Sequence, residues 1–317
     1  MLFKGFQLLK LNETVNFMKL RVPAMIFSTL LIIASIVSLA VNQLNWGLDF
    51  TGGTLIEVGY EQPANLEAIR AQMESAGYSD AVVQNFGSSQ DVLIRLAPRE
   101  GVKAVEIGDQ VMVTLRADGT QVDMRRIEFV GPNVGEELTE QGGLAMLVAL
   151  ICILIYVAMR FEYRFALGSV AALAHDVILT LGLFSFLQLE FDLTVLAAVL
   201  AVIGYSLNDT IVVSDRIREN FRKIRKAEPI EVINISLTQT LNRTIITSLT
   251  TILVLVALFY KGGALIHGFA TALLFGVVIG TYSSVYIASA VGLALGISRD
   301  DLIPTEVEKE GEDLEPL

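Results

Sequence analysis

The chain has 317 residues, of which 53% are hydrophobic and only 18% are charged, with a formal net charge of −11 at pH 7. This composition is more apolar than that of typical soluble domains and indicates a membrane protein. The acidic balance argues against nucleic acid as a partner, because a nucleic-acid-binding surface requires a basic footprint.

Six segments are long and apolar enough to cross a hydrocarbon core, which takes about 20 residues. The first two flank a long polar segment, and the others are joined by short loops except for the longer basic stretch between the fourth and fifth spans. In chain order the predicted spans are residues 22–41, 142–159, 165–187, 193–213, 244–260 and 268–292.

The leader before the first span is basic, with Lys4, Lys10, Lys19 and Arg21. The first span ends in SLAVNQ, which weakly resembles a signal-peptide cleavage site. Its full length and its charged leader nevertheless favour an uncleaved membrane anchor.

Lysine and arginine also concentrate in the loops 160–164 and 214–240, whereas the loops 188–192 and 261–267 carry at most one lysine. Basic loops stay in the cytoplasm. The pattern therefore predicts a multi-pass inner-membrane protein with both termini cytoplasmic and residues 42–141 outside the inner membrane. The predicted parts are a cytoplasmic segment (1–21), a first transmembrane helix (22–41), a periplasmic domain (42–141), a five-helix remainder (142–292) and an acidic cytoplasmic tail (293–317).

The external segment alternates between strand-like and helix-like stretches. Helical spacing predicts helices over 63–76 and 102–117, although the run VMVT weakens the second. Runs rich in β-branched residues predict strands at 54–60, 81–86, 92–96 and 124–130. This βαββαβ order predicts an α+β ferredoxin-like domain, with its first and last strands adjacent and its two helices on one face of the sheet.

Glycines flank the external segment on both sides, in WGLDFTGGT and VGPNVG. We interpret Gly52, Gly53, Gly131 and Gly135 as structural turns, and a hinge role is compatible with that interpretation. The single cysteine, Cys152, lies inside the second span, where a lone thiol forms no disulfide framework. No metal site or cofactor is expected.

The sixth span carries a row of small residues at every fourth position, which allows a second helix backbone to approach closely. Static packing is one interpretation of this row, and a surface along which a helix slides is another. The row comprises Gly268, Ala272, Gly276, Gly280, Ser284, Ala288, Gly292 and Gly296.

Ionisable side chains inside the spans are costly and therefore candidates for function. Asp209 follows Asn208 in the fourth span, and Arg243 opens the fifth, at a similar depth. We expect these two charges to form a pair. Arg243 also shares a helix face with three threonines that make a polar stripe, namely Thr247, Thr250 and Thr251.

Each of these residues also has a purely structural interpretation. Arg243 can be an anchor that reaches to the membrane surface, and Asp209 can form a hydrogen bond between helices. His175 and Asp176 in the third span are adjacent, so they are expected to point to different helix faces. For them, polar support of the site and polar packing remain equal alternatives.

Several long motifs of the chain resemble the SecD/SecF family of protein-export membrane proteins, in its SecF branch, within the resistance–nodulation–division superfamily. The resemblance covers approximately residues 40–296, and no motif position departs from it. The motifs are NWGLDFTGGT, QNFGSS, RRIEFVGPNVG, LAHDVILT, VIGYSLNDTIVVSDRIRENFRKIR and SLTQTLNRTIITSLTT.

The resemblance implies a subunit that works with SecD and uses the proton gradient to promote late preprotein translocation and release in the periplasm. It implies association with the SecYEG channel, YajC, YidC, unfolded preprotein and membrane lipid, and no enzymatic activity. Asp209 and Arg243 match the family positions in the proton path. A small-molecule efflux pump and a passive scaffold are the alternatives; six spans and one small external domain argue against the pump.

The charge pattern makes a topological prediction. A reporter enzyme fused after residue 100 should be active only as a periplasmic protein, and one fused after residue 226 only as a cytoplasmic protein, since lysine and arginine retain their loops inside. Fusion assays in intact cells check this. A cytoplasmic signal at residue 100 would overturn the orientation.

Overall fold

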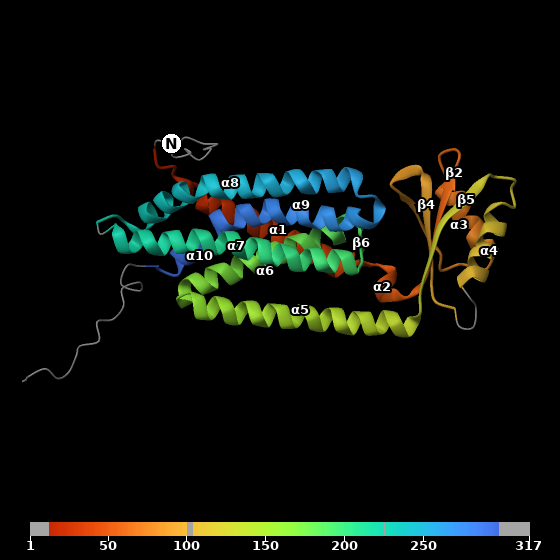
Figure 1. Ribbon diagram of the computed structural model, residues 1–317, viewed down its shortest axis with the longest axis horizontal. Helices are drawn as coiled ribbons and strands as arrows, with labels where there is room; N and C mark the ends of the chain where they lie inside the picture. Colours follow the sequence, from red (N-terminus) through yellow and green to blue (C-terminus); the bar gives the residue numbers. More distant parts are fainter. Residues whose placement is uncertain (1–12, 100–103, 225, 298–317) are drawn as a thin grey trace, which may run out of the picture.

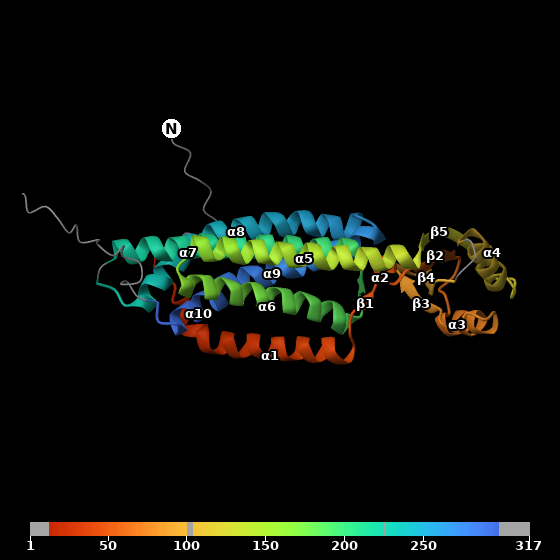
Figure 2. The same cartoon turned by 90° about the horizontal axis from the view of Figure 1, so that it is seen from below.

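The computed structural model describes residues 13–99, 104–224 and 226–297, so most of the basic leader and of the acidic tail lies outside the described residues. The described chain forms an elongated helix bundle with a small α/β domain at one end (Figure 1). A second view at right angles places this domain beyond the end of the bundle as well (Figure 2).

Within the described residues, six helices are long and apolar enough to cross a membrane, as predicted. The chain is therefore a multi-pass membrane protein. These helices are α1 (Arg21–Val41, preceded by the 3-10 turn η1, Phe17–Leu20), α5 (Pro132–Arg160), α6 (Tyr163–Leu187), α7 (Leu193–Lys223), α8 (Pro229–Lys261) and a composite sixth helix of α9 (Ala264–Ser283), η2 (Ser284–Ala288) and α10 (Ser289–Ala294).

Several helices extend beyond the predicted apolar spans. Helix α5 begins at Pro132 rather than at residue 142, with the proline in its first turn, where its missing N–H costs nothing. Helix α7 continues to Lys223 rather than ending at residue 213, because charged residues with good helix propensity extend it past the apolar part.

The fifth span shows the largest correction. Helix α8 begins at Pro229 rather than at residue 244, so Arg243 lies in the interior of the helix and does not open it. The sixth span also contains a π-helical segment, η2, which its sequence did not predict. Such π-helical turns are frequent at functional sites.

The external domain has the predicted element order. It comprises β2 (Gly53–Tyr60), α3 (Leu66–Ser75), β3 (Val82–Phe86), β4 (Ser88–Leu96), α4 (Ala104–Leu115) and β5 (Val122–Val130). The strands form one four-stranded antiparallel sheet in the order β3-β4-β2-β5. The first and last strands are neighbours, as expected, with Gly53 opposite Val130.

Local chemistry moves two boundaries in this domain. Helix α3 starts at Leu66, not at residue 63, because the Asn65 side chain accepts hydrogen bonds from the backbone N–H groups of Glu67 and Ala68. Strand β4 starts at Ser88 and leaves Gly87, at φ +74°, as the centre of a turn shorter than expected.

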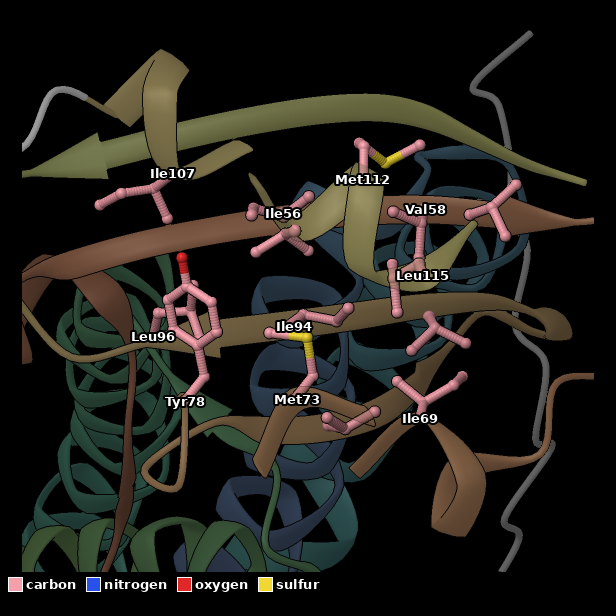
Figure 3. Packing of buried hydrophobic residues seen from close by; sticks show 14 residues of the cluster. Ile56, Val58, Ile69, Met73, Tyr78, Ile94, Leu96, Ile107, Met112 and Leu115 are labelled. Carbon is pink, nitrogen blue, oxygen red and sulfur yellow. The ribbon is translucent and has the colours of Figure 1, made fainter. Parts of the chain in front are cut away.

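The core of the domain lies between one face of the sheet and both helices. Ile56, Val58 and Ile94 from the sheet are fully buried against Met73 of α3 and Leu115 of α4 (Figure 3). Burial of each such side chain contributes roughly 1.5–3 kcal/mol. The two helices therefore cover the same face, as the strand pattern predicts.

A short parallel strand pair joins this domain to the bundle. Strand β1 (Asn45–Trp46) pairs with β6 (Glu190–Phe191), which immediately precedes α7. Arg95 of the sheet lies 3.9 Å from the Glu190 carboxylate. Asp49, in the short helix α2 (Leu48–Thr51), accepts a hydrogen bond of 3.0 Å from the N–H of Leu193, the first residue of α7.

The predicted glycine turns divide into two kinds. Gly52 and Gly53 have positive φ angles of +66° and +120°, and a Cβ on Gly53 would lie 2.2 Å from the Leu96 carbonyl oxygen. Gly131 caps α5 in an extended conformation. Gly135 lies inside α5, so it is not a turn; a Cβ there would come within 3.0 Å of the Gly52 nitrogen.

The buried junction predicts a pH-dependent stability. Burial raises the pKa of the Glu190 carboxyl, and Arg95 offsets this only in part. Because the folded pKa is the raised one, the contribution of Glu190 to the free energy of unfolding is present below its ordinary pKa of 4.5 and is lost as the pH rises through the folded value.

We therefore expect the melting temperature of the wild-type chain, relative to that of Glu190→Gln, to fall as the pH rises from about 4 to about 7. Thermal unfolding in detergent measures the difference between the two profiles. Glu61→Gln, at an exposed loop position, is the control. Parallel profiles for wild type and Glu190→Gln would contradict the prediction.

Candidate functional site

Two carboxyl groups lie inside the helix bundle. Asp176 on α6 has an exposed fraction of 0%, and Asp209 on α7 has 8%. Apolar clusters enclose this level of the bundle: one includes Phe184 and Val199 toward the external domain, and the other includes Phe221 toward the opposite end. Both carboxyl groups therefore depend on hydrogen bonds from neighbouring helices.

Asp209 is held from two sides. Its Oδ1 accepts a hydrogen bond of 2.7 Å from the Thr244 hydroxyl of α8, and its Oδ2 accepts one of 2.5 Å from the Ser284 hydroxyl of η2. Three separate helices thus meet at one carboxylate.

Among the described residues Arg243 makes no ion pair with Asp209, and its side chain is exposed, but its positive charge lies near enough to act electrostatically on the Asp209 carboxyl. The next residue, Thr244, contacts Asp209 instead. Consecutive residues of an α-helix differ in direction by about 100°, so Thr244 points at the carboxylate while Arg243 leaves the helix to one side of it. The depth of Arg243 fits the prediction, but its direction does not.

Three other predicted residues of this group also face outward, whereas Thr251 is half-buried. The side chains of Asn208, Thr247 and Thr250 are exposed. The Thr247 hydroxyl donates to backbone carbonyls of its own helix, those of Arg243 and Thr244. Asn208, Arg243, Thr247 and Thr250 therefore form an outward polar surface.

His175 and Asp176 contact each other directly, contrary to the expectation that adjacent residues point apart. His175 Nδ1 lies 2.8 Å from Asp176 Oδ1. Asp176 Oδ2 accepts hydrogen bonds from the Ser206 hydroxyl of α7, at 2.5 Å, and from the Ser283 hydroxyl of α9, at 2.7 Å.

Beyond the histidine, the polar contacts continue to α1. His175 Nε2 lies 3.2 Å from the Ser28 hydroxyl, which lies 3.0 Å from the Tyr282 hydroxyl. Tyr282 in turn donates to the Ala24 carbonyl at 2.9 Å. A hydrogen-bonded chain therefore runs from α1 through α6 to α9.

Two consecutive serines join the carboxyl groups. Ser283 donates to Asp176 and Ser284 donates to Asp209, at the point where α9 passes into the π-helix η2. Sequence reasoning missed this role, because Ser284 was interpreted only as a member of the small-residue row. The available signal was the pair of hydroxyls in TYSS within an otherwise apolar span.

The small-residue row packs against α7, which accounts for the close approach of these groups. A Cβ on Gly276 would lie 2.2 Å from a methyl carbon of Val202, and one on Gly280 would lie 3.2 Å from Ser206 Cβ. Close packing here brings the α9 hydroxyls within hydrogen-bond distance of carboxylates on α6 and α7.

The fold and the site define a class of protein: a six-span membrane protein with a titratable polar network inside its bundle and an α/β domain outside it. The family model for the C-terminal region of the protein export membrane proteins SecD and SecF matches residues 110–298. The SecD/SecF GG motif matches residues 37–64, which include Gly52 and Gly53. The chain belongs to the SecD/SecF family of protein-export membrane proteins.

Relatives in this family are similar over nearly their whole length. The protein translocase subunit SecF of Vibrio alginolyticus is 61% identical, over 98% of this chain and 99% of the relative. The subunit of Escherichia coli O157:H7 is 50% identical, over 95% of this chain and 94% of the relative. The crystal structure of SecDF from Thermus thermophilus matches with a TM-score of 0.82 and 36% identity, over 91% of this chain and 39% of that longer chain.

Proposed function

We propose that this chain is a proton-gradient-driven accessory subunit of the bacterial Sec translocon, which acts with SecD to promote late preprotein translocation and release. The observation that carries the proposal is Asp209, a carboxyl buried at the meeting point of three helices. Intramembrane ionisable groups of this kind mark ion and proton pathways. The work is transport, without an enzymatic reaction.

Arg243 becomes the switching partner of Asp209 in this proposal. A rotation of α8 by about 100° exchanges Thr244 for Arg243 at the carboxylate, because the two residues are consecutive. Proximity of the guanidinium favours the ionised carboxylate, and its withdrawal favours proton uptake. One charge that crosses about 100 mV provides about 2.3 kcal/mol to bias such a change.

The outward polar surface supports SecD as the partner. Asn208, Arg243 and Thr247 would otherwise face lipid, where exposed polar groups are costly. The match to SecDF of Thermus thermophilus covers 39% of that chain, which leaves room in it for a second half. We propose that SecD covers this surface, and that SecYEG, YajC, YidC and unfolded preprotein are further partners.

The proposed location is the inner membrane, with both termini cytoplasmic and the external domain in the periplasm as a ferredoxin-like domain. Its strand order, β3-β4-β2-β5, supports that fold. Strand β3 lies at one edge of the sheet, where an extended chain can add its backbone hydrogen bonds. The domain is therefore proposed to hold emerging preprotein.

Of the alternatives, an efflux pump would transport small molecules independently of preprotein, and a passive scaffold would be indifferent to the proton gradient. Export measured with an intact and a collapsed gradient separates all three functions. Only the proposed function predicts a component of export that disappears with the gradient and returns when the gradient is restored.

Substitutions at the paired positions test the proton-transfer role. Asp209→Asn keeps size and hydrogen bonding but cannot ionise, and Arg243→Met keeps length without charge. Both variants should assemble with SecD and lose most of the gradient-dependent component of export, measured in membrane vesicles with ATP supplied. The ATP-dependent early steps should persist.

The matched controls are Asp215→Asn and Arg216→Met, which change half-exposed charges further along α7. Both should export like the wild type. If Asp209→Asn assembles normally and keeps its gradient-dependent export, Asp209 is a structural hydrogen-bond acceptor and the proposed role is wrong.

Photo-crosslinkers test the contact with preprotein. A crosslinker at Val82 or Gln84 on the edge strand β3 should capture a stalled translocating chain, because an extended segment pairs with a free strand edge. Met159, 83% exposed at the far end of α5, is the control position and should capture none. Absence of capture throughout β3, with normal export, would refute the contact.

A further inference from the structure

The hydrogen bonds beyond His175 determine which of its nitrogens carries a proton. The Tyr282 hydroxyl can donate one hydrogen bond, and it donates this bond to the Ala24 carbonyl oxygen, which can only accept. Ser28 must therefore donate its proton to the Tyr282 oxygen. The Ser28 oxygen then accepts from its other neighbour, so His175 Nε2 carries a proton.

The contact on the other side of the ring then requires one more proton. His175 Nδ1 and Asp176 Oδ1 are 2.8 Å apart, and two bare acceptors do not approach in this way. The proton lies on Nδ1, as imidazolium and carboxylate, or on Oδ1, as imidazole and carboxylic acid. In both forms the pair holds one shared proton and is neutral in sum, which suits its side-chain exposures of 1% and 0%.

The two serines between the carboxyl groups each have a second acceptor. Ser283 lies 2.7 Å from Asp176 Oδ2 and 3.2 Å from the Gly280 carbonyl. Ser284 lies 2.5 Å from Asp209 Oδ2 and 3.0 Å from the Thr281 carbonyl. Each hydroxyl has one proton to donate, so each must favour one acceptor.

The charge of the carboxyl group decides that choice. An ionised carboxylate is the stronger acceptor and therefore accepts the hydrogen bond that the serine hydroxyl donates. A proton on Asp209 Oδ2 can itself be donated to the Ser284 oxygen, and Ser284 then donates to the carbonyl of its own helix. In the acid form of Asp176 the proton lies on Oδ1, so Oδ2 becomes a weaker acceptor and Ser283 favours the Gly280 carbonyl. The bonding within one turn of α9 therefore depends on the protonation of Asp176 and of Asp209.

We propose that the His175–Asp176 pair is a second proton-holding site, and that Ser283 and Ser284 couple it to Asp209 by exchanging carboxyl for backbone acceptors. The coupling arises because the serines are consecutive and open the π-helix η2, where backbone hydrogen bonding is already altered. The coupling rests on the proposed function of Asp209, whereas the shared proton does not.

The titratable neighbours are few within the described residues. Asp176 contacts His175 of its own helix, and the imidazole of His175 lies 6.1 Å from the ring of Tyr282 on α9. The charged side chain that acts on Asp209 is Arg243 of α8, the neighbour of Thr244. A change at Asp209 thus has a direct route to the imidazole through the two serines.

Nitrogen-15 spectroscopy of histidine tests both parts, since the chain has only two histidines. The labelled full chain is studied in its complex with the partner subunit in lipid, and His175→Gln identifies the His175 signals. His175 should show a protonated Nε2 and an Nδ1 shift intermediate between the protonated and the free form. An unprotonated Nε2 would overturn the shared proton.

The coupling is tested by variants in the same preparation. Asp209→Asn should shift the His175 Nδ1 signal and leave His267, which packs on Phe259, unchanged. Adding Ser283→Ala, or separately Ser284→Ala, should abolish that shift. Adding Ser169→Ala should not, because this buried serine donates only to its own helix at Phe165.

The outcomes separate the two proposals. No shift in Asp209→Asn, or a shift that survives both serine variants, overturns the coupling whatever the export result. If gradient-dependent export is normal in Asp209→Asn, the proton-transfer role of Asp209 is wrong. The histidine spectra then still test, independently, whether His175 and Asp176 share a proton. An unchanged His267 signal verifies that each variant is folded.

Discussion

The structure depends on one constraint: a carboxyl group buried among apolar helices must receive its hydrogen bonds from other helices. Asp176 and Asp209 together take donors from α7, α8, α9 and η2. The two donors from the sixth span, Ser283 and Ser284, reach the carboxyl groups because α9 approaches α7 along a face of glycines such as Gly276 and Gly280. The small-residue row and the polar network are therefore parts of one arrangement.

Features that follow from local periodicity could be predicted from the sequence. The six spans and the four strands, in their order along the chain, depend on runs of apolar or β-branched residues, which fold in the same way in many contexts. Helix ends such as Pro132 and Pro229 could not be predicted from hydropathy. The apolar part of a helix shows where it meets lipid, but capping and propensity decide where it begins.

The sequence indicated how deep in the membrane the site residues lie, but not which way their side chains point around the helix axis. Asp209 and Arg243 were expected at one level of the membrane, yet the residue that contacts the carboxylate is the neighbour, Thr244. His175 and Asp176 were expected to diverge, yet a long side chain beside a short one meets it. Direction around a helix axis depends on how the helices are rotated against each other, and no single segment encodes that rotation.

Helix α7 connects the two parts of the molecule. It begins at the junction where Asp49 binds Leu193, and it carries Asp209 further along the same continuous helix. The external domain is also fixed to α5, because β5 leads into that helix through Gly131 alone. A domain attached at two helices moves when one shifts against the other. Under the proposed function, a displacement of α7 at Asp209 is therefore expected to reach the external domain through the Asp49–Leu193 hydrogen bond and the β1–β6 pair.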